Sequence, residues 1–380
     1  MAKIFICGDV VNTEKQSGEI LSPSLEQIVL GADYAICNFE APVEGAGSPI
    51  AKSGPHIQQK ATTLYGLKKQ GFDLIQLANN HIMDFGSSGL METIKQAHLA
   101  KLDVIGAGAD FNSAYKPLIK EINGVVFGII NACEAQFGVL DYFQDKNTAG
   151  YAWINHNQID KNIIDLKKQC DFVLVLSHAG LENYSIPQRE WRERYQHFCD
   201  LGADVVVGAH PHVPQGFEEY KASLIFYSLG NFYFDWGGHA ANDDKSYAVM
   251  LEFDKASRIK VTPVFHITRI EQRVVDVANY NERVDIKALS ESLKNGYEKL
   301  HEMMVLSAYE KVKTNFLRGF SVIPRGHGLK STIKELVASL LGRRKHIDKK
   351  ILSLHLIRNE AYYYVTRNAL ELEARGKAKK

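Results

Sequence analysis

The chain has 380 residues, of which 45% are hydrophobic and 23% charged, and its formal net charge is +1. This length predicts one large domain with an extension, or two domains. The near-neutral charge does not favour a polyanionic partner, so nucleic-acid binding is not expected. No apolar run approaches the roughly 18 residues of a membrane span, so we expect no membrane-spanning helix.

The N-terminal sequence MAKIFICGDVV does not resemble a signal peptide. It has one lysine, and its apolar run is too short for a secretory core before the Gly-Asp turn. The cysteines are odd in number and form no C-x-x-C motif, which is typical of free thiols in a reducing compartment. They are Cys7, Cys37, Cys133, Cys170 and Cys199. We therefore expect a cytoplasmic protein, and the sequence leaves its oligomeric state open.

Short apolar runs alternate with helical patterns over the first two thirds of the chain. The predicted strands are 3–7, 33–37, 73–77, 103–106, 124–131, 171–177, 203–207 and 223–228. The predicted helices between them are 58–70, 87–101, 157–169 and 187–201. Several strands are continuously apolar, as expected for strands covered on both faces. The alternation predicts a layered α/β fold.

The pattern changes after about residue 246. Residues 246–253 and 258–267 alternate as an antiparallel hairpin does, and 285–380 is mostly helical with a break at 323–328. We expect an α/β domain over 1–275 and a helical extension over 285–380. Because its apolar stripes would otherwise be exposed, the extension should pack on the α/β domain.

The last forty residues are basic. They hold 11 Lys/Arg and 4 Asp/Glu, a net of +7. A solvated helix face is the simplest interpretation, and contact with nucleic acid or an acidic membrane is the alternative.

Polar side chains recur where an apolar run stops. Carboxyl ends of strands in α/β sheets are where ligand sites form, so several such ends together indicate one site. The residues concerned are Asp9, Asn38, Glu40, Asn79, Asn80, His81, His178, His210 and His212. Taken singly, Asp9 also suits a turn and His178 a buried histidine without a ligand.

Carboxylate, amide and imidazole groups without cysteine suit Mn, Fe or Zn. We therefore expect one or two divalent transition-metal ions, which can activate water and neutralise an oxyanion. Pro211 should hold His210 in an extended conformation, so that His210 and His212 point to the same side.

Six ordered blocks carry a family resemblance. They are GD at 8–9, NFE at 38–40, NNHIMDFG at 79–86, SHAGLE at 177–182, GADVVVGAHPHVPQ at 202–215 and YSLGNFYFD at 227–235. They resemble the CapA family, the poly-gamma-glutamate or capsule biosynthesis group of the calcineurin-like metallophosphoesterase superfamily. The resemblance covers about residues 3–270. It implies a four-layered α/β/β/α sandwich with metals at the strand ends.

The resemblance also implies roles for residues. The implied metal ligands are Asp9, Glu40 as the bridging carboxylate, Asn80, His178, His210 and His212. His81 matches the histidine that donates a proton to the leaving group, and we expect Asp84 to orient it. We expect Asn38, Asn79 and Asn231 to contact substrate, although Asn79 also suits a cap and Asn231 a structural position. His239, in the loop 235–244, is a further candidate to cover the pocket.

Two positions depart from the superfamily pattern. Val11 stands where the usual Asp-x-His motif has histidine, which favours one ion over two. Glu40 replaces the usual aspartate. The sequence thus indicates a metal-dependent hydrolase of a phosphoester or amide bond, linked to capsule or exopolymer biosynthesis and acting on a small anionic substrate or polymer. The alternative is a non-catalytic, metal-containing accessory factor that binds an anionic polymer or ligand.

Overall fold

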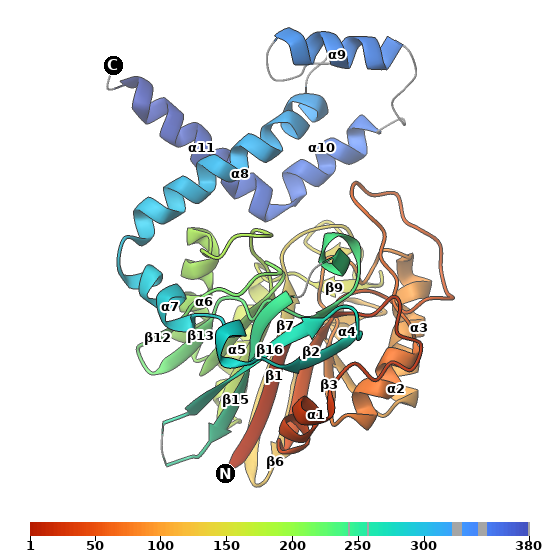
Figure 1. Cartoon of the computed structure of the whole chain (residues 1–380), viewed down its shortest axis with the longest axis vertical. Coiled ribbons are helices and arrows are strands. Elements are labelled where there is room, and N and C mark those ends of the chain that lie inside the picture. The colour runs from red at the N-terminus through yellow and green to blue at the C-terminus, as the bar shows by residue number, and fades with distance from the viewer. Residues whose placement is uncertain (242–243, 257, 321–328, 341–347, 379–380) are drawn as a thin grey trace.

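The computed structural model describes residues 1–241, 244–256, 258–320, 329–340 and 348–378. Two β-sheets lie face to face, and helices cover the outer face of each (Figure 1). Further helices at the C-terminal end lie over one end of this sandwich. Among the residues described, no helix is long and apolar enough to cross a membrane.

The first sheet has eight strands in the order β17-β16-β15-β1-β2-β3-β4, with β14 also paired to β1. The segment from β1 to β4 is parallel, and β15 to β17 continue it antiparallel on the other side of β1. The strands are β1 (Ala2–Val11), β2 (Tyr34–Phe39), β3 (Leu74–Gln76), β4 (Asp103–Ile105), β14 (Asn231–Phe234), β15 (Asp244–Phe253), β16 (Lys260–Arg269) and β17 (Val274–Val277). The predicted hairpin is therefore confirmed as β15 and β16.

The second sheet has six strands in the order β12-β13-β11-β10-β7-β6. They are β6 (Leu118–Ile122), β7 (Val125–Cys133), β10 (Phe172–His178), β11 (Val205–Ala209), β12 (Phe217–Tyr220) and β13 (Ser223–Phe226). A small third sheet holds β5 (Ala107–Gly108), β8 (Val139–Leu140) and β9 (Gly150–Ala152). The central strands β7, β10 and β11 are almost fully buried, which explains their continuously apolar sequences.

Three apolar clusters hold the layers together. Ile36 of the first sheet and Leu174 of the second belong to the cluster between the sheets. The first sheet is covered by α1 (Pro23–Leu30), α2 (Thr62–Lys69) and α3 (Gly86–Leu99). The second is covered by α5 (Asn157–Lys167) and α6 (Arg189–Leu201), with the short α4 (Phe111–Ala114) nearby. The predicted four-layered sandwich is confirmed.

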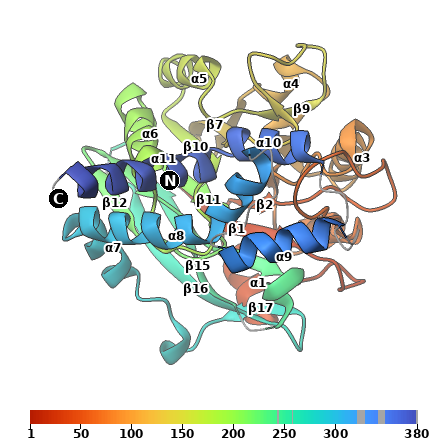
Figure 2. The same ribbon diagram turned by 90° about the horizontal axis from the view of Figure 1, so that it is seen from above.

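In the described part of the chain, five α-helices follow the last strand. They are α7 (Ile286–Lys294), α8 (Tyr297–Phe320), α9 (Leu329–Leu340), α10 (Lys349–Arg358) and α11 (Glu360–Ala378). Figure 2, seen from above, shows α8, α10 and α11 lying across the sandwich. Val305 of α8 and Val365 of α11 are buried in one apolar cluster with Leu181 of the α/β part. The expected packing of the extension is thus confirmed, and the predicted break at 323–328 lies outside the described residues.

Glu360, at the first turn of α11, ties the extension to the α/β part. One carboxylate oxygen accepts hydrogen bonds from the backbone N–H of Ala135 at 2.8 Å and the indole N–H of Trp153 at 3.0 Å. The other accepts one from the amide of Asn155 at 2.8 Å. A carboxylate in the first turn also interacts favourably with the helix dipole.

Candidate metal centre

Both sheets end at one edge, and their polar side chains meet there. Asp9 lies near the end of β1, and Glu40 directly follows β2. From the other sheet, His178 is the last residue of β10, and His210 directly follows β11. Asp9, Glu40 and His178 are fully buried, and His210 is 1% exposed. The strand-end pattern therefore brings distant segments into one buried cluster.

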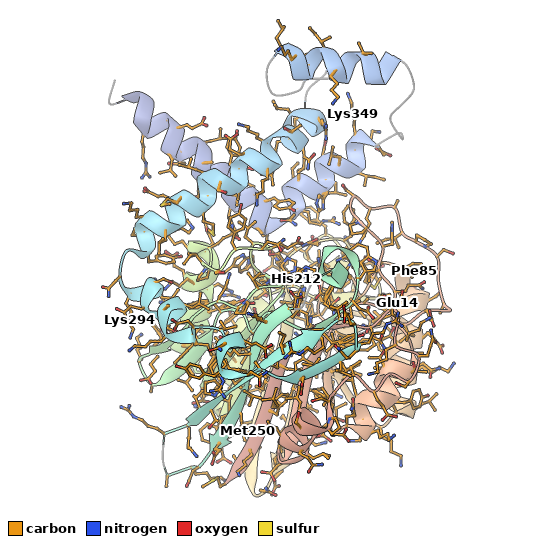
Figure 3. All side chains as sticks on the ribbon, viewed as in Figure 1. Glu14, Phe85, His212, Met250, Lys294 and Lys349 are labelled. Carbon is orange, nitrogen blue, oxygen red and sulfur yellow. The ribbon has the colours of Figure 1, made fainter. Side chains whose placement is uncertain are left out.

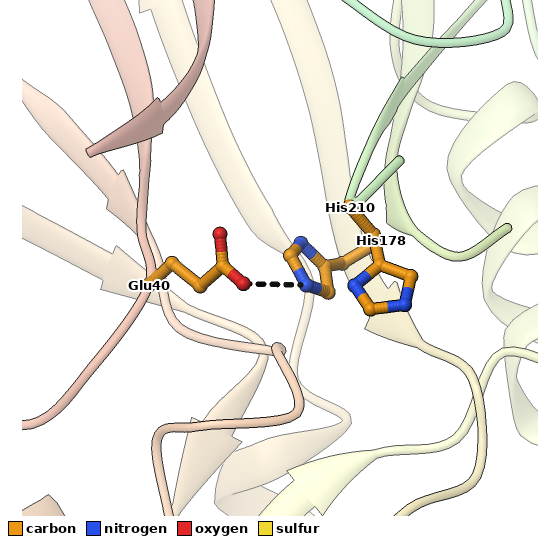
Figure 4. Close-up of side chains that lie close together, drawn as sticks. All are labelled: Glu40, His178 and His210. Atoms are coloured by element: carbon orange, nitrogen blue, oxygen red, sulfur yellow. Dashed lines mark ion pairs between the residues drawn. The ribbon is translucent and has the colours of Figure 1, made fainter. Parts of the chain in front are cut away.

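Glu40 belongs to two groups of possible metal ligands. One group is Glu40, His178 and His210, and the other is Asp9, Glu40 and His212. Within each group, the candidate ligand atoms lie within 4.8 Å of one another. Figure 4 shows Glu40 facing His178, with Oε1 3.5 Å from the imidazole Nε2. Glu40 is thus the shared carboxylate of two adjoining groups.

The surroundings of Glu40 fit a cation. Neither of its carboxylate oxygens has a hydrogen-bond partner among the described residues. Burial raises the pKa of Glu40 well above its ordinary value, and the charge of Asp9 raises it further. A buried carboxylate without partners is costly, and a coordinated metal ion removes that cost. The donor set of carboxylates, imidazoles and an amide suits a divalent transition metal.

The pKa values of the histidines in the cluster shift in different directions. Burial lowers the pKa of His178 to about 4 and that of His210 well below its ordinary value. Both rings are therefore neutral at neutral pH, which is the form that binds metals. Burial also disfavours the charged form of His212, but Glu40 and Asp9 outweigh it and raise its pKa. The carboxylates thus create a site that attracts positive charge.

The backbone at His210 and His212 differs from the prediction. The φ angles are +96° and +60°, so neither residue is extended. Pro211 disfavours the right-handed helical region for the residue before it but does not enforce an extended chain. The backbone N–H of His210 donates to Asp9 at 3.2 Å, which holds this uncommon conformation. The two rings still converge, with centroids 5.9 Å apart.

Two asparagines form hydrogen bonds with the candidate ligands. The amide nitrogen of Asn38 lies 2.7 Å from Asp9 Oδ1 and 3.1 Å from His178 Nδ1. Asn231 Oδ1 lies 3.0 Å from His212 Nδ1, so it accepts that N–H and leaves Nε2 for the cluster. Such partners fix the orientation of ligands.

Asn79 is also buried behind the site. Its side-chain oxygen accepts from the backbone N–H groups of His81 and Ile82, and its amide donates to Phe39. Like Asn38 and Asn231, it does not line the pocket described below. Most polar atoms of these three asparagines face protein groups, although Asn38 Oδ1 has no hydrogen-bond partner among the described residues. Their contact with substrate stays a prediction.

Asn80 and His81 reach the cluster from the loop after β3. Asn80 Oδ1 lies 3.0 Å from His178 Nε2. His81 Nδ1 lies 2.7 Å from Asp84 Oδ2, and the other oxygen of Asp84 pairs with Lys52. The backbone N–H of Ile57 also donates to Asp84 Oδ2 at 2.8 Å. Burial lowers the pKa of His81, against the opposing charge of Asp84.

A pocket of about 290 Å³ opens beside this cluster. Asn80, His81, His212 and Glu182 form part of its lining, and so does His239 from the loop after β14. Figure 3 places His212 near the end of the sandwich that the C-terminal helices cover.

Two carboxylates were missed by the sequence analysis. Glu182 forms a third possible ligand group with His210 and His212, and it stands in the quoted block SHAGLE. Glu134 is fully buried, with Oε1 3.6 Å from His210 Nε2. It directly follows β7, so the strand-end rule finds it once that strand is extended from 131 to Cys133.

Val11 occupies the position where the superfamily's Asp-x-His motif has histidine. It is fully buried in a small apolar cluster with Ala41, Ile57 and Phe234. The position therefore supports packing and offers no metal ligand.

Known proteins are similar to this chain mainly over its α/β part. The PGA biosynthesis protein CapA of Bacillus subtilis is 32% identical over 254 residues, which are 66% of this chain and 66% of that protein. The capsule biosynthesis protein CapA of Bacillus anthracis is 33% identical over 240 residues, 61% of this chain and 58% of that one. The chain thus spans slightly less than two thirds of the length of these relatives.

One solved structure that matches is the calcineurin-like phosphoesterase YfkN of Bacillus subtilis. The match has a TM-score of 0.42 and 14% identity, and it covers 82% of this chain and 98% of that chain. A putative 5'-nucleotidase of Staphylococcus aureus has a TM-score of 0.43 and 14% identity, covering 78% and 58%. Residues 3–236 match the family model described as bacterial capsule synthesis protein PGA_cap, and the chain belongs to that family.

Proposed function

We propose that this protein is a metal-dependent hydrolase that acts on a phosphoester or amide bond in capsule or exopolymer biosynthesis. The observation that carries the proposal is Glu40, a buried carboxylate with no hydrogen-bond partner among the described residues, shared by two groups of metal-ligand side chains. The names of the relatives support the link to capsule synthesis.

The chain offers ligands for one or two ions. Asp9, Glu40 and His212 would hold one, and Glu40 with His178 and His210 the other. Asn80 and Glu182 are additional candidate ligands at the pocket side. A divalent ion bound there supplies Lewis acidity and lowers the pKa of bound water. Because Val11 stands in place of one expected ligand, the binding of a single ion also fits this proposal.

His81 is the proposed proton donor. Its Nδ1 is held by Asp84, so Nε2 is the nitrogen left for a substrate in the pocket. Burial lowers the pKa of His81, so its imidazolium is a stronger acid but a smaller fraction carries the proton at neutral pH. The assignment as donor therefore rests on the position of Nε2 and not on the pKa. Asp84 is a positioning residue in this scheme, because it acts through the ring and not on the substrate.

The accessory-factor alternative keeps the metal but has no turnover. To distinguish the hydrolase from the accessory factor, the protein is purified and its bound metals are measured. A panel of phosphoesters and γ-glutamyl amides is then assayed with Mn, Fe or Zn added. Hydrolysis that disappears with a chelator and returns with metal supports the enzyme. A fully metal-loaded protein that hydrolyses nothing, yet binds an anionic polymer, supports the accessory factor.

A further inference from the structure

The pocket beside the metal centre has a second wall that comes from the C-terminal helices. His355 of α10, Asn359 between α10 and α11, and Tyr362 of α11 all line it. These residues lie far beyond the segment that matches the family model, residues 3–236. Figures 1 and 2 show α10 and α11 lying over the end of the sandwich where the metal centre is located.

Packing fixes this wall in place. The His355 ring stacks on Phe137, with centroids 5.8 Å apart and an interplanar angle of 8°. Tyr362 meets His355 edge-on, with centroids 5.9 Å apart. The side chain of Asn359 accepts from the backbone N–H of Tyr362 at 2.9 Å, which sets the start of α11. The two rings are therefore held in defined orientations beside the pocket.

The wall has unused hydrogen-bonding capacity. Within the part of the chain that the structure describes, the buried Nδ1 of His355 has no hydrogen-bond partner. No described residue hydrogen-bonds to the Tyr362 hydroxyl either, and Tyr362 lines the same pocket as Glu182 and His81. Unpartnered polar groups in such a position favour a ligand that satisfies them.

The three side chains of the wall are also uncharged, and the guanidinium of Arg358, 5.8 Å from the centre of the Phe137 ring, is not part of the pocket lining. Burial lowers the pKa of His355 to about 4, so its imidazole is neutral at neutral pH. The nearby ammonium group of Lys52 is paired with Asp84 and adds no net charge. Gln136 and Phe137 complete this side of the pocket. Neutral donors and acceptors beside an aromatic ring suit amide or hydroxyl groups better than a second anion.

We propose that the C-terminal helices complete the substrate pocket, and that Tyr362 and His355 bind an amide or hydroxyl group of the substrate while its reacting bond lies at the metal centre. The inference rests on the proposed function for the position of the reacting bond. The pocket, at about 290 Å³, lies at the small end of the range for ligand sites. Its ligand is therefore a compact molecule or the end of a polymer, not a long internal stretch.

Two probes separate the ends of the pocket. Inorganic phosphate is small and reaches only the metal end, whereas the dipeptide γ-glutamyl-glutamate carries an amide that reaches the wall. Both are titrated into the full-length, Mn²⁺-loaded protein by calorimetry. We expect Tyr362→Phe to weaken dipeptide binding about fivefold, the loss of one neutral hydrogen bond of about 1 kcal/mol. Phosphate binding and manganese content should stay unchanged, and His355→Leu should act in the same direction.

The control is Tyr363→Phe, one residue further along α11, where the side chain is 44% exposed and does not line the pocket. It should leave both affinities unchanged. The inference is overturned if Tyr362→Phe binds the dipeptide as the wild type does, if it weakens both probes equally, or if the wild type binds phosphate but not the dipeptide. If the metal-loaded wild type binds neither probe, the proposed function fails as well, and the inference fails with it.

Discussion

Among single residues, Glu40 is the one on which both groups of candidate ligands depend. It is fully buried, and its neighbours supply three imidazoles and the second carboxylate, Asp9. Asn38 and Asn231 then hold Asp9, His178 and His212 in orientation. Amide side chains thus orient the candidate ligands, which is the part that outer-shell partners take in metal centres.

At this scale, we expect His210→Ala to lose metal and activity together. The substitution removes a ring that belongs to two of the candidate ligand groups, and alanine offers no ligand atom in its place. The measurement is metal content after purification, with turnover on the best substrate of the panel. His98→Ala, at an exposed position on α3, is the matched control and should keep both. Retention of full metal content in His210→Ala would remove this histidine from the ligand set.

His81→Gln should behave differently. Metal content should remain nearly that of the wild type, while turnover falls about 10²–10⁴-fold, the usual contribution of a general acid or base. The loss should shrink for substrates with good leaving groups, because these need less protonation. A variant that hydrolyses a poor leaving group at the wild-type rate would show that His81 is not the acid.

At the scale of elements, the ends of β1, β2, β10 and β11 position the centre. These ends were predictable, because each apolar run stops in a polar residue. Glu134 was missed since the predicted strand stopped at 131, whereas β7 continues to Cys133. The prediction of an extended backbone at His210 was wrong. The positive φ of this residue depends on a hydrogen bond to Asp9, about 200 residues away in the chain.

The extension supplies another prediction at this scale. Glu360→Ala should lower the free energy of unfolding by about 2 kcal/mol or more, because it leaves the N–H groups of Ala135, Trp153 and Asn155 without their acceptor. Denaturant unfolding measures this change, and proteolysis of α11 shows whether the helix detaches.

Glu371→Ala is the control for that experiment. Glu371 is on the same helix, and its pair with Arg375 at 3.6 Å is exposed, so it should cost less than about 0.5 kcal/mol. Equal losses in the two variants would show that the contacts of Glu360 do not hold the extension in place.

For the whole molecule, the layered fold and the cluster of candidate ligands could be predicted from periodicity, strand ends and the family resemblance. The second wall of the pocket could not. His355, Asn359 and Tyr362 lie in or between helices that carry no motif, and they reach the pocket only because α10 and α11 pack over the sandwich. Contacts of this kind depend on tertiary packing between distant segments, which local sequence patterns do not encode.

The proposed metal centre depends above all on Glu40, the carboxylate shared by two groups of candidate ligands at the strand ends. The most direct test compares the melting temperatures of the wild type and Glu40→Gln, each stripped with a chelator and then supplied with Mn, Fe or Zn. Glutamine keeps the shape of the side chain and removes its charge. The metal-free variant should therefore melt above the metal-free wild type, since it no longer buries a carboxylate without partners.

On adding metal, the wild type should gain stability, because an ion that binds only the folded state stabilises it. The variant should gain little or nothing, so the order of the two melting temperatures should reverse. If no metal shifts the melting temperature of the wild type, or if Glu40→Gln responds as strongly as the wild type, Glu40 is not a metal ligand.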